Sequence, residues 1–293
     1  MNILIALIPA LGWGIFPLIA GKIKNSQPVN ELMGLGTGAL IVGIITAIIH
    51  PTNSNLTIFS LSLISGIFWT IGQSGQFISM RNIGISKTMP LSTGLQLIGN
   101  TLIGAIIFGE WTSSSQYLIG TLALVLIIIC VSLTALSKDK SAKLKIRDII
   151  LLLFTSVGYW IYSSFPKAIT ADAQTLFLPQ MIGIFIGSII FLLVSHQTKV
   201  LKEKATWLNI FSGFSFGIAA FAYIFSAQLN GVITAFIYSQ LCVIISTLGG
   251  IFFIGENKTK LELVETFVGL ILIIMVQLFN EILKLTKTSD DLF

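Results

Sequence analysis

Three uncharged polar residues, Thr93, Gln96 and Asn100, lie at helical spacing in a stretch that carries no charge between Lys87 and Glu110. The stretch is long enough to cross a bilayer as a helix, and the three side chains then share one face. In hydrocarbon such groups cost free energy unless they meet partners or water. They therefore either bind neighbouring helices or line a lumen suited to a polar, neutral ligand.

Aromatic rings and further amides recur on other apolar runs. Trp69, Gln73 and Gln76 lie at i, i+4 and i+7, again on one face. An indole deep in the membrane either fills the core or stacks on a ring-shaped ligand. Rings that stack on C–H faces, beside amides that offer donors and acceptors, suit a sugar. The candidate substrate-binding residues are Trp13, Trp69, Gln73, Gln76, Thr93, Gln96, Asn100, Tyr159, Gln180 and Gln240.

The composition is that of an integral membrane protein. Hydrophobic residues make up 54% of the chain and charged residues 10%, and the mean hydropathy is +0.93. The formal charge of +5 does not indicate nucleic-acid binding, because the basic residues occupy short loops between apolar runs. Cys130 and Cys242 lie within apolar segments and are expected to be packing residues. No metal-binding, nucleotide-binding or nucleophile motif occurs, so neither a cofactor, a metal nor an enzymatic activity is expected.

Apolar runs of roughly 20 residues predict an all-α membrane protein with ten transmembrane helices. The first run has no basic segment before it, which favours a retained helix over a cleaved signal. The segment 137–147 is a predicted linker between two five-helix halves, 1–136 and 148–284, and 285–293 forms a short tail. The predicted spans are 3–21, 31–50, 58–80, 86–108, 116–136, 147–165, 176–195, 207–227, 232–254 and 263–283.

The two halves carry matching glycine patterns, which indicates an internal duplication. An odd number of spans in each half makes the second copy insert upside down, and inverted repeats are typical of transporters. The matches are Gly34 and Gly38 with Gly183 and Gly187, Ser65-Gly66 with Ser212-Gly213, Gly84 with Gly231, and Gly109-Glu110 with Gly255-Glu256.

Basic residues gather in alternate loops. The even-numbered loops hold only Lys167, and the C-terminal tail holds Lys284 and Lys287. By the positive-inside rule the odd-numbered loops are cytoplasmic, and both termini are then extracellular. The odd-numbered loops hold Lys22, Lys24, Arg81, Lys87, Lys138, Lys140, Lys143, Lys145, Arg147, Lys199, Lys202, Lys204, Lys258 and Lys260.

A proton-coupled transporter usually places a titratable residue within the membrane. Here Glu31, Glu110, Asp172, Glu256 and Glu265 all lie near predicted span ends, where a carboxylate is either a solvated helix cap or a coupling group. Glu31 is the candidate for proton coupling, because it opens a glycine-rich span beside the expected lumen.

Five runs resemble the glucose/ribose porter family, a group of bacterial sugar uptake proteins within the drug/metabolite transporter superfamily. They are PALGWGIFP (9–17), SGIFWTIGQSGQ (65–76), IGISKTMPLSTGLQL (83–97), LPQMIG (178–183) and SQLCVIISTLGGIFFIGE (239–256). The resemblance implies two inverted five-helix repeats and a cavity lined by the first four helices of each. It also implies a secondary transporter in the bacterial cell membrane, taking up a monosaccharide by proton symport with alternating access.

The resemblance does not select between glucose and ribose, because different spans are closer to different members. An exporter or importer of another small metabolite, an amino acid or a drug, would share the superfamily fold. Such a carrier should prefer a charged or more apolar lumen than these amides indicate. The coupling ion, its stoichiometry, the oligomeric state and the face to which the cavity opens stay open.

Overall fold

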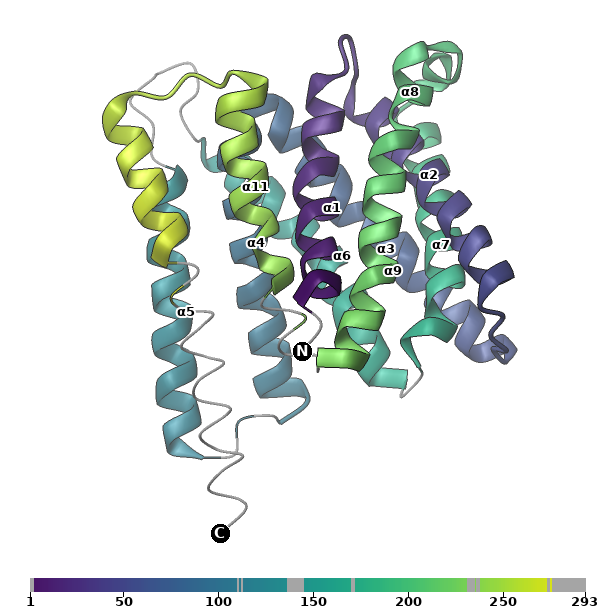
Figure 1. The fold of residues 1–293 in the computed structure, drawn as a ribbon, viewed down its shortest axis with the longest axis horizontal. Helices are drawn as coiled ribbons and strands as arrows, with labels where there is room; N and C mark the ends of the chain where they lie inside the picture. The colour runs from purple at the N-terminus through teal and green to yellow at the C-terminus, as the bar shows by residue number, and fades with distance from the viewer. Residues whose placement is uncertain are drawn as a thin grey trace.

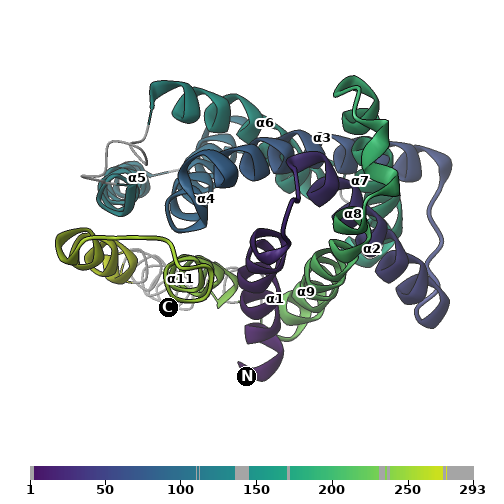
Figure 2. The ribbon, with the colours of Figure 1, turned by 90° about the horizontal axis from the view of Figure 1, so that it is seen from above.

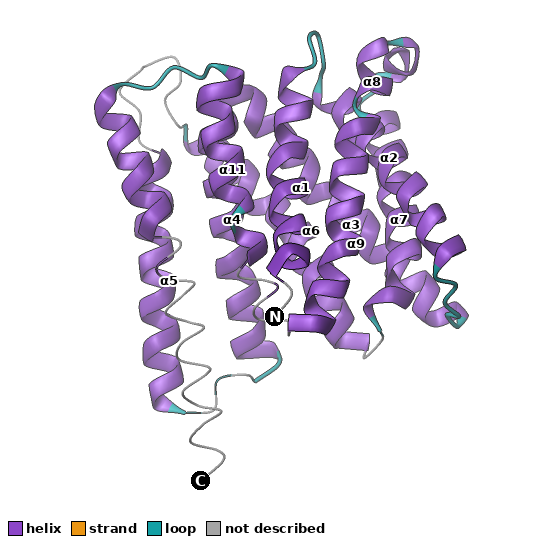
Figure 3. Cartoon of the chain, viewed as in Figure 1, coloured by secondary structure: helices purple, strands orange, loops and turns teal. Residues whose placement is uncertain are grey.

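A computed structural model describes residues 3–109, 111, 113–135, 145–169, 172–230, 235, 238–272 and 275 of the chain. Within these residues all regular structure is helical, which confirms the predicted all-α class (Figure 3). The predicted linker up to residue 144, the tail 285–293, Glu110 and Gly231 lie outside the described residues.

The helices stand side by side with their long axes running in similar directions (Figure 1). Each of the ten predicted spans contains helix among the described residues. In the first half the helices are α1 (Ile3–Lys22), α2 (Pro28–Ile49), α3 (Leu56–Ile83), α4 (Ile85–Leu102), a π turn η1 (Ile103–Ile107) and α5 (Ser114–Ala135).

The second half begins with α6 (Ile146–Ile169) and α7 (Ala173–Val194). A 3-10 turn η2 (Thr198–Lys202) and the short α8 (Lys204–Leu208) connect these to α9 (Ile210–Asn230). Next come α11 (Cys242–Gly249), which continues as a π turn η3 (Gly250–Ile254), and a helix at 260–272.

Local sequence signals set several helix ends. Pro28 opens α2, where its fixed φ and missing N–H are tolerated. The side chain of Asn55 accepts a 2.8 Å hydrogen bond from the backbone N–H of Ile58 and so caps α3. Gly84 separates α3 from α4 with a φ of 87°, a conformation that glycine adopts without strain.

Seven of the described helices are long and apolar enough to cross a membrane. Their outward faces carry large apolar side chains, such as Ile48, Phe154 and Val194, each more than 70% exposed. In a soluble protein such a surface would be a liability, whereas lipid covers it at no cost. The predicted membrane class is therefore borne out.

Seen from above, the helices form two walls (Figure 2). One wall contains α3, α4 and α6, and the other contains α1, α9 and α11. α3 packs against both α6 and α7, α9 packs against both α1 and α2, and α2 packs against α7. The largest buried apolar cluster lies among these helices.

Two of the close helix crossings have glycine on both sides. A Cβ at Gly38 of α2 would lie 2.8 Å from the Cα of Gly213 in α9. A Cβ at Gly66 of α3 would lie 3.0 Å from the Cα of Gly183 in α7. Small residues let helix backbones approach closely, which is how helices associate within lipid.

We expect Gly66→Ala to destabilise the protein by about 1–3 kcal/mol, since the added methyl overfills the crossing. The new Cβ would overlap the backbone carbonyl oxygen of Gln180, which cannot move aside as a side chain could. Thermal unfolding in detergent measures the effect, with Ile64→Ala on the outward face of α3 as the control. Equal unfolding temperatures for the two variants would contradict the close contact.

Candidate functional site

A cavity of about 450 Å³ lies between the two walls. Its volume falls in the range of small-molecule sites. Its lining comes from α1, α3, α4, α6, α7 and α9. Gln240 and Cys242, at the start of the apolar helix Tyr238–Ile254, also contribute. None of the described residues that line it is acidic or basic.

All ten residues predicted from sequence to bind substrate line this one cavity. They come from distant parts of the chain. The faces of α3 and α4 that helical periodicity selected are the faces that line the cavity. Their shared location is an observation, while their contact with a substrate remains a prediction. The ten are Trp13, Trp69, Gln73, Gln76, Thr93, Gln96, Asn100, Tyr159, Gln180 and Gln240.

Aromatic rings form the apolar part of the cavity. Trp69 is 5% exposed, and its ring centroid lies 4.5 Å from that of Phe216 and 5.9 Å from that of Tyr159. Trp13 lies on the other wall, 5.6 Å between centroids from Tyr223. These contacts fix the rings in place, which gives a ligand rigid apolar surfaces.

The amides on α3 are joined to each other and to both neighbouring helices. The Tyr159 hydroxyl donates to Oε1 of Gln73 at 2.8 Å, and Nε2 of Gln73 donates to Oε1 of Gln76 at 3.1 Å. Nε2 of Gln76 then donates to Oγ of Ser92 at 2.9 Å, and Nε2 of Gln96 donates to the same oxygen at 3.2 Å. The two interpretations of the polar face therefore both hold, because the amides bind neighbouring helices and line a cavity.

Three other polar atoms at the cavity wall are buried and have no hydrogen-bond partner: Nε1 of Trp13, Oδ1 of Asn100 and Oε1 of Gln240. An unpaired buried polar group costs roughly 1–3 kcal/mol. These three atoms are therefore candidates for hydrogen bonds to a ligand in the cavity.

Sequence reasoning did not select Ser92, Phe216 or Tyr223. Ser92 lies one turn before Gln96 on the same side of α4, and this spacing was the signal that could have identified it. It receives two of the amide hydrogen bonds. Phe216 and Tyr223 are two of many aromatic residues on apolar runs. Their spacing of nearly two helical turns was the signal that could have identified them.

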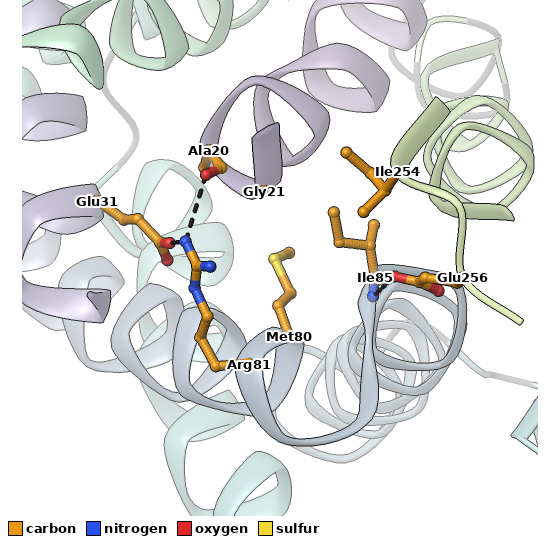
Figure 4. Close-up of a pocket in the computed structure, with 8 residues that line it drawn as sticks. All are labelled: Ala20, Gly21, Glu31, Met80, Arg81, Ile85, Ile254 and Glu256. Carbon is orange, nitrogen blue, oxygen red and sulfur yellow. Dashed lines mark hydrogen bonds and ion pairs between the residues drawn. The ribbon is translucent and has the colours of Figure 1, made fainter. Parts of the chain in front are cut away.

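Glu31 lies outside this cavity, in a second pocket of about 160 Å³ (Figure 4). Its carboxylate is buried and forms an ion pair with the guanidinium of Arg81. The same guanidinium donates to the backbone carbonyl oxygen of Ala20 at 3.3 Å. Glu31 is therefore not a solvated cap, and its contacts join the start of α2 to the ends of α1 and α3.

Glu256 lies on the other side of this pocket (Figure 4). Its carboxylate accepts from the backbone N–H groups of Ile85 and Ser86 and so caps the start of α4. Nearby in the same loop, burial and the charge of Lys87 lower the pKa of Lys258 to about 8. Of the other predicted carboxylates, Asp172 is exposed and Glu265 is partly exposed.

The two pockets follow one another along the same helices. Phe16, Gln76 and Met89 line the larger cavity. One helical turn away from these residues, Ala20, Met80 and Ile85 line the smaller pocket. Phe77 is fully buried at this level and packs edge-on against Phe16, with 6.3 Å between ring centroids. A thin apolar layer thus separates an uncharged cavity from a charged pocket.

Comparison with known proteins gives a consistent picture. The family model described as "Sugar transport protein" matches residues 4–283. A Lactobacillus helveticus protein named as a sugar uptake protein is 90% identical over 94% of this chain and 98% of its own length. A Latilactobacillus sakei protein named as the ribose uptake protein RbsU is 45% identical, covering 94% of this chain and 96% of the relative.

The glucose uptake protein GlcU of Staphylococcus xylosus is 41% identical, over 97% of this chain and 99% of the relative. One solved crystal structure covers 96% of both chains with a TM-score of 0.65 and 13% sequence identity. At that identity the likeness concerns the fold alone.

A pair of tryptophan variants tests whether the Trp13 indole is held free for a ligand. Nε1 of Trp160 donates to the carbonyl oxygen of Leu95 at 3.0 Å, whereas Nε1 of Trp13 has no partner. We expect Trp160→Phe to be less stable than Trp13→Phe by about 1 kcal/mol, because only the first loses a hydrogen bond. Thermal unfolding without added sugar measures the difference. Equal losses would mean that the Trp13 indole has a structural partner.

Proposed function

The chain belongs to the sugar transport protein family, and on that premise we propose that it takes up a monosaccharide, glucose or ribose, through the cavity between its two walls. The observation that carries the proposal is the cavity's lining of aromatic rings and amides without a charged residue among those described. Rings stack on the C–H faces of a sugar, and amides exchange hydrogen bonds with its hydroxyl groups. The protein acts as a transporter and not as an enzyme.

The alternative is a carrier of an amino acid or a drug. The ammonium and carboxylate groups of an amino acid are costly to bury without charged or hydrogen-bonding partners. Because the described lining residues are uncharged, the cavity favours a neutral polyol over an amino acid or a charged drug.

We further propose that the two halves are inverted five-helix repeats. The contact pattern supports this, because the Gly38–Gly213 crossing of α2 and α9 has its counterpart in the Gly183–Gly66 crossing of α7 and α3. The register that these contacts favour pairs Gly38 with Gly183, one helical turn from the sequence match of Gly34 with Gly183. The π turns η1 and η3 also occupy matching places, each followed by a glycine with positive φ, Gly109 and Gly255.

The stacking of the two pockets also supports transport by alternating access. The larger cavity extends to Phe108, Ser164 and Leu176, at the ends of the helices opposite Glu31 and Arg81. With the odd-numbered loops in the cytoplasm of a bacterial cell, this end is extracellular, as are both termini. The Phe16–Phe77 layer and the Glu31–Arg81 ion pair close the cytoplasmic end. Release of the sugar inward requires both to separate.

Glu31 is the proposed site of proton coupling. A proton on its carboxylate would remove the charge that holds Arg81, so protonation would weaken the contact that joins α1, α2 and α3. The coupling group therefore acts at the closed end of the path and not on the sugar itself. The neutral lining of the larger cavity is consistent with this separation.

Counterflow in proteoliposomes tests the substrate, because it does not depend on the coupling ion. We expect labelled glucose to enter vesicles preloaded with unlabelled glucose. Ribose and other sugars should compete with it, and the order of their competition identifies the preferred substrate. An aromatic amino acid should not compete. If glucose is not carried, labelled ribose is tested next. Uptake of the amino acid with no uptake of any sugar would overturn the proposal.

Glu31→Gln tests the coupling. A glutamine cannot take up the proton, so we expect proton-driven accumulation to be abolished while sugar counterflow continues. Asp172→Asn, at an exposed carboxylate before α7, is the matched control and should accumulate sugar as the wild type does. Accumulation by Glu31→Gln at the wild-type level would show that the proton is carried elsewhere.

A further inference from the structure

A continuous hydrogen-bond chain crosses three helices at one wall of the cavity. It runs from Tyr159 on α6 through Gln73 and Gln76 on α3 to Ser92 on α4, where Gln96 joins it. The first four residues are at most 5% exposed. Gln96 is less buried, and it lines the cavity. We call this set the amide chain.

The contacts at Ser92 give the direction of the amide chain at its inner end. Ser92 has one hydroxyl proton and contacts two amides, so at least one of them must donate to it. In the structure both amides donate to Ser92 through Nε2. Gln76 then turns its oxygen towards Gln73, and Gln73 turns its own oxygen towards the Tyr159 hydroxyl.

The direction of the chain decides what Gln96 offers a ligand. With one hydrogen of Nε2 donated to Ser92, the carbonyl oxygen of Gln96 and its second amide hydrogen keep fixed positions at the cavity. If the amide could rotate, this acceptor and this donor would exchange places. A wall of fixed polarity can distinguish sugars that differ only in the direction of one hydroxyl group.

From these contacts we propose that Tyr159 is a positioning residue, which sets the orientation of the cavity amides through Gln73 and thereby determines which sugar epimers the protein accepts. The inference rests on the proposed uptake of a monosaccharide. Tyr159 is also a predicted substrate-binding residue, and it lines the cavity. Its hydroxyl proton is donated to Gln73, so the hydroxyl acts on the substrate through the amide chain.

The opposite wall shows what the same position does without such a chain. Gly12 of α1 packs against the carbonyl oxygen of Ser215, just as Gly158 of α6 packs against that of Phe68. Trp13 and Tyr159, the residues after the two glycines, therefore occupy matching places. Five residues after Ser215, Ala220 stands where Gln73 follows Phe68.

Alanine cannot accept a hydrogen bond through its side chain, and Nε1 of Trp13 has no partner. The amide chain thus holds its own polar groups in a fixed direction. The facing wall leaves the Trp13 donor for the ligand.

Tyr159→Phe tests the proposal by removing only the hydroxyl oxygen. Half-saturating concentrations and maximal counterflow rates are measured for the sugar that the wild type carries and for its epimers. We expect about a tenfold rise in the half-saturating concentration for the preferred sugar, since a buried amide loses its partner. Discrimination against the epimers should fall by a similar factor, while the maximal rate stays within about twofold, because the change affects recognition.

Ser92→Ala separates positioning from direct contact. Ser92 is fully buried and does not line the cavity, so it can affect epimer discrimination only through the amide chain. We expect the same loss of discrimination as in Tyr159→Phe. Tyr117→Phe, which removes the same oxygen from an exposed residue of α5, should behave as the wild type does.

Four outcomes decide the matter. Loss of discrimination in both Tyr159→Phe and Ser92→Ala supports the proposal, and if one variant does not fold, the other carries the test. Wild-type discrimination in every variant that folds overturns it, although sugar uptake itself would stand. A change in Tyr159→Phe together with wild-type discrimination in a folded Ser92→Ala also overturns it, because the Tyr159 hydroxyl would then contact the sugar directly. Failure of the wild type to carry any sugar would instead refute the proposed function.

Discussion

Within lipid, helices gain little from burying apolar surface against one another, so close backbone contact must hold them together. In this protein two such contacts are Gly38 on Gly213 and Gly66 on Gly183. They hold α2 against α9 and α3 against α7. The helices α4, α6, α1 and α11 stand on either side of a space that side chains do not fill. Close packing between α2 and α9 and between α3 and α7 thus accompanies an open space between the two walls.

Because lipid offers no hydrogen bonds, the polar groups around the cavity are constrained as well. On the wall of α3, α4 and α6, Gln73, Gln76 and Gln96 are paired among themselves, with Tyr159 and with Ser92. Asn100 of α4, like Trp13 and Gln240 on the other side, has a buried polar atom without a partner. A transporter must bind its substrate and also release it. Polar groups that are already paired and polar groups that are not divide these requirements, since the unpaired groups gain most from hydrogen bonds to a substrate.

Sequence periodicity was sufficient to identify the helix faces but not the partners of the residues on them. Thr93, Gln96 and Asn100 share a face wherever α4 is placed, so their common cavity could be predicted. Glu31 was expected beside the lumen. It lies instead in a separate pocket, where it pairs with Arg81 from the end of α3. Ser92 was missed for the same reason. Its importance arises from Gln76 on another helix, and no spacing along one helix reveals a contact across two.

The charged pocket and the uncharged cavity are separated by a layer of apolar side chains, and this limits how the proposed sugar and proton sites can be coupled. A neutral sugar in the larger cavity offers no charge to which the Glu31–Arg81 pair could respond directly. Any signal must pass mechanically, through Phe16 on α1 and through Phe77 and Met80 on α3. Gln76 and Arg81 lie on the same helix, little more than one turn apart. A shift of α3 that tightens the amides around a sugar would therefore also move the guanidinium that holds Glu31. The helix that carries the recognition residues is the element best placed to transmit binding to the closed end.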